Sequence, residues 1–273
     1  MSNKEGGYDV CVIADYGVGD PAFIEVNAQL RARGKDLFRS IDNIAVSSFS
    51  TLATGFWIRQ IGVENGYENL AIFSNTAPRG TKEAINWEGD ERQRLLYGRL
   101  KNGVPVFAIS SGYNWSFIRD ELEVFHDIEI PNSGSQFRSR DLYPEAAKLI
   151  LSGDTSILGS ELDTDSIPAV PINRIAFIDR YGNIKTTTRR SQFSSNLVNE
   201  RLLLVGIGEA NQIVENHLSG ARSANGRVGL LPGSSGRKED PYLELIKRGG
   251  SAAEVFGRPL VSDTTVEISF SAA

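Results

Sequence analysis

The segment from Asp15 to Asp20 carries the residue types best suited to chemistry in this chain. Asp15 comes directly after the apolar run Val10–Ala14, and the flexible glycines Gly17 and Gly19 follow it. A carboxylate at the end of a buried strand can accept two hydrogen bonds from a vicinal diol such as a ribose. The alternative is that Asp15 caps the next helix, a role for which Asp20 is the better candidate. The residues alone leave both interpretations open.

Other polar segments carry weaker signals. Arg138 and Arg140 would form either a solvated pair or a clamp for an anion. The segment Ser234-Ser235-Gly236-Arg237 is by itself only a turn with a cation. The pattern Gly206-Ile207-Gly208 lacks the third glycine of a dinucleotide fingerprint, so we interpret it as a chance match.

The composition is that of an ordinary globular protein. Of its 273 residues, 40% are hydrophobic and 23% are charged, which excludes a disordered chain, a collagen-like repeat and a small disulfide scaffold. The net charge of −5 argues against nucleic acid or an anionic membrane as a partner. No run approaches the roughly 20 apolar residues of a membrane span, and the first residues carry no signal segment. We therefore expect a soluble, cytoplasmic protein.

Residues that commonly bind metals are scarce. The single cysteine, Cys11, lies in an apolar run, which predicts a thiol buried in the core and excludes an intrachain disulfide. The two histidines, His126 and His217, are isolated. The sequence therefore predicts no metal site.

The first half of the chain alternates short apolar runs with helical patterns. We expect strands at Val10–Ala14, Ile44–Phe49, Leu70–Ser74 and Val104–Ile109. We expect helices at Ala22–Arg33, Leu52–Ile61, Asp90–Leu100 and Tyr143–Leu151. This alternation predicts an α/β domain with a mostly parallel sheet covered on both faces. Ligands bind beyond the carboxyl ends of such strands, which indicates the loops Asp15–Asp20, Asn75–Thr81 and Ser110–Asn114.

The composition changes near Gly159. The stretch 161–173 is polar and contains prolines, so we predict a linker between a domain of residues 1–160 and a domain of residues 174–273. Beyond the linker we expect strands at Arg174–Ile178, Asn183–Thr188, Arg201–Val205, Val228–Leu231, Tyr242–Ile246 and Thr265–Phe270. Helical patterns are confined to Glu209–Leu218 and Ala252–Phe256. The second half is thus predicted to be a small, all-β antiparallel domain.

Short segments spread over nearly the whole chain share a pattern with one known family. They are Ala14-Asp15-Tyr16-Gly17 with Asp20 after it, Phe137-Arg138-Ser139-Arg140-Asp141, Asp179-Arg180-Tyr181-Gly182-Asn183, Ser234-Ser235-Gly236 and Gly250-Ser251-Ala252-Ala253. Taken in this order, they resemble the motifs of the S-adenosylmethionine (SAM) hydroxide adenosyltransferase family. The relatives of that family include the adenosyl-fluoride and adenosyl-chloride synthases.

The resemblance implies an α/β first domain, a β-barrel-like second domain and a homotrimer with its sites between subunits. SAM would be the substrate or bound ligand, held between the first domain of one subunit and the second domain of its neighbour. By family position, Asp15 would hold the ribose diol, with Asp20 beside it. The other ligand-binding positions would be Asp179, Tyr181, Asn183, Ser234, Ser235 and Arg248.

The chain departs from the cluster of Asp, Arg and His with which the family's hydrolases generate and hold the attacking water. The corresponding positions hold Thr76, Glu83 and Arg138, and Arg79 is a candidate replacement for the missing cation. Ser139 occupies the position where the fluoride-using relatives place a hydroxyl donor. We therefore name Thr76, Arg138 and Ser139 as candidate catalytic residues. Arg138 beside Ser139 would alternatively hold a larger anion such as a carboxylate.

The resulting hypothesis is an enzyme that breaks the C5′–S bond of SAM, with water as the acceptor and adenosine and methionine as products. A small attacking anion must lose its water, so fixed donors must replace those hydrogen bonds. In-line placement against the C–S bond supplies further acceleration. Two alternatives remain open: a different, pathway-specific reaction on the same fold, and a protein that binds an adenosyl ligand without turnover.

Overall fold

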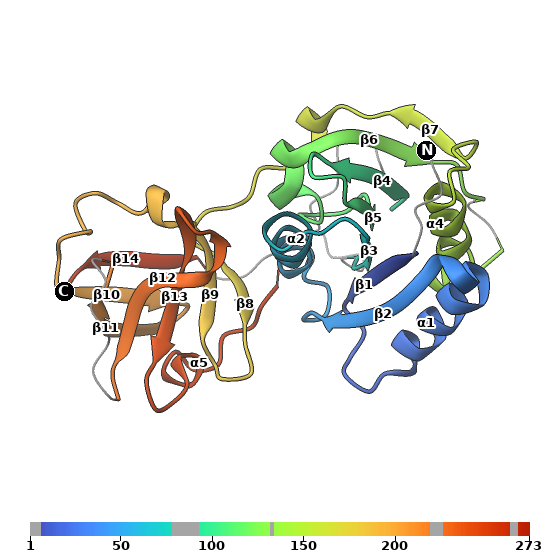
Figure 1. The fold of residues 1–273 in the computed structure, drawn as a ribbon. Helices are drawn as coiled ribbons and strands as arrows, with labels where there is room; N and C mark the ends of the chain where they lie inside the picture. The colour runs from blue at the N-terminus through green and yellow to red at the C-terminus, as the bar shows by residue number, and fades with distance from the viewer. Residues whose placement is uncertain (1–6, 78–92, 132–133, 219–225, 263–266) are drawn as a thin grey trace. The chain divides into compact units, whose positions relative to one another are not determined.

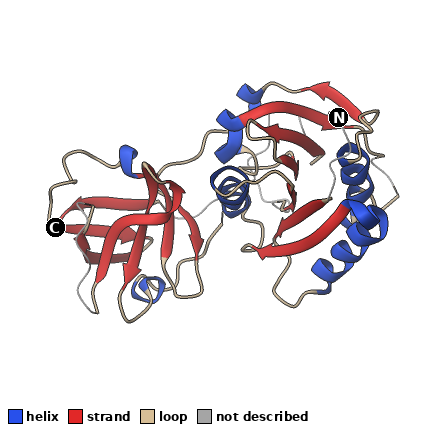
Figure 2. Ribbon diagram, in the orientation of Figure 1, coloured by secondary structure: helices blue, strands red, loops and turns tan. Residues whose placement is uncertain are grey.

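The computed structural model describes residues 7–77, 93–131, 134–218, 226–262 and 267–273. The chain divides into two compact units, Met1–Ala169 and Val170–Ala273, and the division falls within the segment 161–173. Each unit is built on one seven-stranded sheet (Figure 1). In the second unit strands account for far more residues than helices do, whereas the first unit contains similar shares of both (Figure 2). The protein therefore has a two-domain, sheet-rich fold.

The sheet of the first unit is mixed. Its strand order is β2-β1-β3-β5-β4-β6-β7. The strands are β1 (Tyr8–Ala14), β2 (Phe38–Ala45), β3 (Leu70–Asn75), β4 (Leu95–Leu100), β5 (Pro105–Ile109), β6 (Leu122–Ile128) and β7 (Leu158–Glu161). Pairing is parallel from β2 through β1 and β3 to β5, and antiparallel from β5 through β4 and β6 to β7. The expected mostly parallel sheet is not confirmed.

A short connection explains the antiparallel half. Strands β4 and β5 are joined by residues 101–104, where Gly103 has a φ of 86° and donates its N–H to the carbonyl of Leu100 at 2.7 Å. A parallel pair needs a crossover of a dozen or more residues, so this turn allows only an antiparallel hairpin. The helix expected at Asp90–Leu100 is wrong from residue 95 onward, because β4 lies between β5 and β6 and buries Leu95, Leu96 and Leu100. Residues 90–92 lie outside the described part of the chain.

Among the described residues of the first unit, three α-helices of nine residues or more cover the sheet. Helices α1 (Pro21–Gly34) and α4 (Tyr143–Leu151) pack against one face, and α2 (Thr51–Arg59) lies on the other (Figure 1). The side chain of Asp20 accepts from the N–H of Ala22 at 2.8 Å, which confirms Asp20 as the N-cap of α1. The short α3 (Arg138–Asp141) directly precedes α4. Within the described residues, no helix is long and apolar enough to cross a membrane.

Local backbone and burial settle two further expectations. The strand expected at Ile44–Phe49 is wrong beyond its first two residues. Strand β2 spans Phe38–Ala45, and Phe49 adopts a left-handed φ of 64° that a strand does not allow. Cys11 is a buried free thiol in β1, and burial raises its pKa to about 12. The prediction of a core cysteine is therefore confirmed.

The sheet of the second unit has the order β14-β10-β11-β12-β13-β9-β8 and curls into a half-barrel. Its strands are β8 (Ile175–Ile178), β9 (Ile184–Arg189), β10 (Leu202–Ile207), β11 (Ala210–Asn216), β12 (Val228–Arg237), β13 (Asp240–Lys247) and β14 (Ile268–Ala272). The edge strands β14 and β8 are linked by a backbone hydrogen bond: the N–H of Ile268, the first residue of β14, donates to the carbonyl of Asn173, just before β8, at 2.7 Å. The short α5 (Ala252–Val255) follows β13. Every pairing in this sheet is antiparallel except the short one between β11 and β12.

The helix expected at Glu209–Leu218 is wrong, because these residues contain strand β11. Ile207 pairs with Ala210, so Gly208 and Glu209 form a two-residue hairpin loop. Gly208 has a φ of 62°, which such a tight turn requires at its first central position. The glycine pattern at 206–208 therefore serves a hairpin.

Candidate functional site

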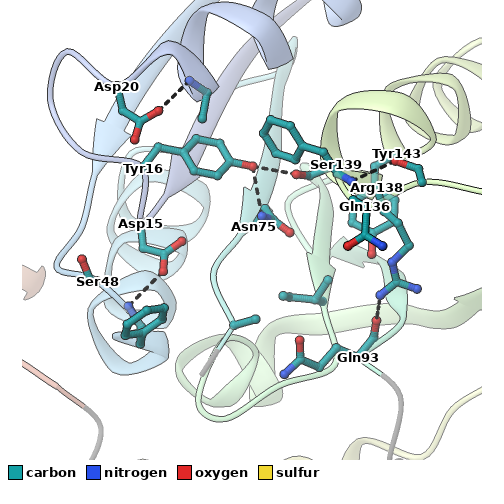
Figure 3. A pocket seen from close by; sticks show the side chains of 16 residues that line it. Asp15, Tyr16, Asp20, Ser48, Asn75, Gln93, Gln136, Arg138, Ser139 and Tyr143 are labelled. Carbon is teal, nitrogen blue, oxygen red and sulfur yellow. Dashed lines mark hydrogen bonds between the residues drawn. The ribbon is translucent and has the colours of Figure 1, made fainter. Parts of the chain in front are cut away.

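A cavity of about 600 Å³ opens at the edge of the first sheet where its parallel strands end (Figure 3). Its volume lies within the range of small-molecule sites. The lining residues come from the segments that follow β1, β2 and β3, from the segment before β4, from the end of β5, and from the segment that runs through α3 to the start of α4. They are Asp15, Tyr16, Asp20, Ala22, Ser48, Phe49, Asn75, Ala77, Gln93, Ile109, Ser135, Gln136, Phe137, Arg138, Ser139 and Tyr143.

The topology explains why the cavity forms at this edge. Parallel strands end on the same side, and the chain leaves neighbouring strands in different directions, which opens a crevice. Two of the three predicted loops contribute to it, with Asp15, Tyr16 and Asp20 from the first and Asn75 and Ala77 from the second. The third expected loop, Ser110–Asn114, is buried and is not part of the lining.

Asp15 lines the cavity and also holds the loop that follows β2. Its Oδ2 accepts a hydrogen bond from the backbone N–H of Phe49 at 2.9 Å. Phe49 has the left-handed φ of 64°, which is strained for an aromatic residue, and the residue is 44% exposed. Asp15 therefore stabilises a strained residue at the cavity. The helix-cap alternative for Asp15 is wrong, since Asp20 caps α1.

Tyr16 joins two other lining residues from distant parts of the chain. Its Oη lies 2.7 Å from Oγ of Ser139 and accepts from Nδ2 of Asn75 at 3.0 Å (Figure 3). The ring packs edge-on against Phe23 and Phe137. Burial raises the pKa of Tyr16 to about 12, so the phenol is neutral near neutral pH.

The two arginines of the mid-chain motif have different environments. Arg138 lines the cavity, donates to the carbonyl of Gln93 and lies with its guanidinium carbon 5.7 Å from the ring centre of Tyr143. Arg140 instead pairs with Glu25 and Asp141, each at 2.7 Å. Arg140 therefore fastens α3 in place, and Arg138 is the arginine that a ligand would meet.

Thr76 is fully buried and is not part of the lining. Its Oγ1 is 2.9 Å from Oγ1 of Thr54, and its carbonyl accepts from Nδ2 of Asn114 at 3.0 Å. The structure therefore places Thr76 among internal polar contacts at the end of β3. The related candidates Arg79 and Glu83 lie outside the described residues.

Within the second unit, Asp179 and Asn183 hold a hairpin turn together. Asp179 accepts from the backbone N–H groups of Tyr181 and Asn183 at 2.9 and 3.0 Å, and from Nδ2 of Asn183 at 2.9 Å. Gly182, with a φ of 79°, touches the start of α5 so closely that a Cβ there would meet Oγ of Ser251 at 2.0 Å. The turn presents Tyr181 to solvent, and this residue is 81% exposed.

Ser234 contacts a buried ion pair. Lys185 and Glu244 form this pair, with 6% and 3% of the residue exposed. The backbone N–H of Ser234 donates to Glu244 at 3.2 Å, and Nζ of Lys185 lies 3.3 Å from Oγ of Ser234. Ser235 is buried, and Arg248 is exposed. These candidates belong to the second unit, whereas Asp15, Asp20, Arg138 and Ser139 share one cavity of the first.

Several lining residues were not singled out from the sequence. Asn75 follows directly after a predicted strand, which is the same signal that identified Asp15. Ser48 and Phe49 were assigned to an expected strand and Gln93 to an expected helix, whereas the structure has all three, like Gln136, in irregular segments. Among the described residues, no cluster of three or more His, Cys, Asp or Glu side chains is arranged to hold a metal.

We expect a pH-dependent contribution from Asp141, which anchors α3. Hydrogen bonds from Arg140 and then Ser135 lower the pKa of Asp141 from 3.8 to about 2. Because the pKa of Asp141 is lower in the folded protein, its ionised carboxylate stabilises the fold at pH values above 3.8. This contribution is lost as the pH falls from 3.8 towards 2. Between these pH values the Tm of the native protein should fall more steeply than that of Asp141→Asn. Parallel Tm profiles in thermal unfolding would contradict the anchoring role.

Comparison with known proteins identifies the fold only. No family model matches the chain, and no curated protein does. An uncharacterized conserved protein from Thermotoga maritima is similar in structure over 96% of this chain and 100% of its own, with a TM-score of 0.71 and 15% identity. A conserved hypothetical protein from Thermus thermophilus is similar over 97% of this chain and 100% of its own, with a TM-score of 0.65 and 15% identity. These likenesses support the architecture and say nothing of activity.

Proposed function

We propose that the protein binds SAM and breaks its C5′–S bond, with water as the acceptor. The observation that carries the proposal is the cavity in which the carboxylate of Asp15 and the hydroxyl of Ser139 lie across from each other (Figure 3). Asp15 supplies an acceptor for a ribose diol, and Ser139 supplies a hydroxyl for the reacting end. The resemblance of the sequence motifs to the SAM hydroxide adenosyltransferases supports the same assignment.

The reaction suits a site of this character. The water oxygen forms a bond to C5′, the C5′–S bond breaks, methionine leaves as a neutral thioether, and a proton passes to solvent. SAM carries a positive sulfonium, which the carboxylates of Asp15 and Asp20 attract. Fixing the sugar through its diol aligns C5′ with the attacking group, and such alignment removes much of the entropic barrier.

We further propose that the second unit of a neighbouring subunit completes the site in a homotrimer. Tyr181, Ser234 and Arg248 are exposed, as residues that meet a ligand across subunits must be. Asp179 and Asn183 bond to each other within the turn, so their role in this proposal is to present Tyr181.

Incubation of the pure protein with SAM tests the proposal. We expect adenosine and methionine in equal amounts, measured by liquid chromatography and mass spectrometry. The incubation is repeated in chloride and in fluoride, where 5′-haloadenosine would reveal a halide acceptor instead. Full recovery of SAM, together with no heat of SAM binding in titration calorimetry, would overturn the proposal.

The second candidate is a protein that binds an adenosyl ligand without turnover. It is favoured by Thr76, which occupies the position of the hydrolases' aspartate but is buried away from the cavity lining. Micromolar binding of SAM without any product would establish this alternative. A bound small molecule other than SAM or its products, detected by native mass spectrometry, would instead indicate a different reaction on this fold.

A further inference from the structure

Asn75, Tyr16 and Ser139 form a short chain of hydrogen bonds in which the donor of one bond decides the donor of the next. The phenol oxygen lies between Nδ2 of Asn75 and Oγ of Ser139, at 3.0 and 2.7 Å (Figure 3). Phe23 and Phe137 pack edge-on against the ring of Tyr16 and keep it in this position. Both Asn75 and Ser139 also line the cavity.

A neutral phenol has one proton to donate. Because burial raises the pKa of Tyr16 to about 12, the group keeps that proton near neutral pH. Asn75 donates to the phenol oxygen, and Oγ of Ser139 is the acceptor within hydrogen-bond distance of the buried phenol, so we assign Tyr16 as the donor in its bond with Ser139. In this arrangement the hydroxyl proton of Ser139 points away from Tyr16. Asn75 uses its Nδ2 for the phenol, so the remaining polar atom of its amide is the oxygen Oδ1, which accepts hydrogen bonds.

The two ends of this chain therefore have opposite character. Since both residues line the cavity, Ser139 can serve there as a donor and Asn75 as an acceptor. If the Asn75 amide were turned over, the direction of the chain would reverse and the two roles would exchange, but one donor and one acceptor would remain. Both groups bond to the same phenol oxygen, which brings them within reach of one small group.

We propose that Asn75 and Ser139 hold a neutral hydroxyl group, water or an alcohol, between them, and that Tyr16 imposes this selectivity. A hydroxyl both donates and accepts, so it satisfies both ends. A halide or a carboxylate only accepts, so its charge would face the oxygen of Asn75. The binding claim rests on the geometry of the first unit, whereas the further claim that this hydroxyl attacks C5′ rests on the proposed function.

Tyr16→Phe removes a single oxygen and keeps the ring contacts. Without the phenol, the Asn75 amide can turn its NH₂ group towards the cavity while Ser139 still donates. Two donors then converge, and such a pair favours an anion. Tyr67→Phe is the matched control, because it removes a hydroxyl that bonds to Asp9 elsewhere in the first unit.

Bromide, located by its anomalous scattering in crystals of each variant soaked in sodium bromide, tests the selectivity. We expect water between Asn75 and Ser139 in the native protein and in Tyr67→Phe, and bromide at that position in Tyr16→Phe. Bromide at this position in the native protein would overturn the proposal, and so would its absence from Tyr16→Phe. Refined structures of the variants show whether the ring and the fold are retained.

A double-mutant cycle on SAM cleavage tests whether Tyr16 acts through Ser139. We expect Tyr16→Phe to slow cleavage roughly tenfold in the native background and to have no further effect in Ser139→Ala. An equal effect in both backgrounds would show a merely structural role and overturn the positioning claim. If the native protein does not cleave SAM, the proposed function fails and the bromide result alone decides this inference. If the cleavage assay shows that the native protein cleaves SAM, but the soaked crystals show bromide between Asn75 and Ser139 of the native protein, the inference fails and the proposed function stands.

Discussion

If Asp15 holds the ribose of SAM as proposed, replacing it by alanine should weaken SAM binding severely, and replacing it by asparagine should weaken binding less while the fold stays intact. The asparagine keeps an oxygen that can accept from the N–H of Phe49, as Oδ2 of Asp15 does at 2.9 Å. It loses the charge and the second acceptor that a diol requires. Each charge-assisted hydrogen bond contributes about 1.5–3 kcal/mol, so we expect losses of about 100-fold or more for alanine and about tenfold for asparagine. Titration calorimetry with SAM and with adenosine measures both.

The stability of the same variants separates the two roles of Asp15. Asp15→Ala should lower the Tm, because the strained Phe49 loses its anchor. Asp15→Asn should leave the Tm close to the native value. Asp42→Asn, an exposed position on β2 outside the cavity lining, controls for the change in net charge. Unchanged SAM affinity in Asp15→Asn would show that the diol role is misassigned, even if Asp15→Ala binds poorly.

Replacing Lys185 by methionine should destabilise the second unit by about 3–5 kcal/mol, because it leaves a buried carboxylate without its cation. Glu244 is only 3% exposed. Its side chain packs tightly against Gly233 of β12, since a Cβ added to that glycine would lie only 2.4 Å from Cγ of Glu244. The carboxylate therefore has no room to reach solvent without moving the strand. Urea unfolding, followed by far-ultraviolet circular dichroism, measures the loss.

The double variant Lys185→Met with Glu244→Gln should recover much of the lost stability, because it removes the unpaired charge. Lys238→Met, at an exposed position of the same unit, is the control for losing one lysine and should change stability little. A loss below about 1 kcal/mol in Lys185→Met would contradict the account of Glu244 as a carboxylate that depends on its partner.

Local signals in the sequence were sufficient for several elements. The helical pattern at Ala22–Arg33 predicted α1, and Asp20 was the better candidate for its cap, because both depend on residues within one or two turns of each other. Asp15 was placed at a ligand-binding edge because a carboxylate directly after an apolar strand cannot continue the core. The structure places Asp15 in the lining of the cavity at that edge.

Local signals failed where distant residues decide the conformation. The pattern at Glu209–Leu218 favoured a helix, yet pairing with β10 makes residues 210–216 a strand. Residues 95–100 form a strand because β5 and β6 flank them on both sides. Propensity is a weak preference, and burial within a sheet outweighs it.

The sequence by itself indicated the division into two units, the capped helix α1 and the acidic turn after β1, since each depends on neighbours along the chain. Only the tertiary structure decided the mixed strand directions, the buried pair of Lys185 with Glu244 and the bond between Tyr16 and Ser139, which are 123 positions apart. Contacts of this kind form when the whole domain packs, because their free energy depends on burial that no local segment provides.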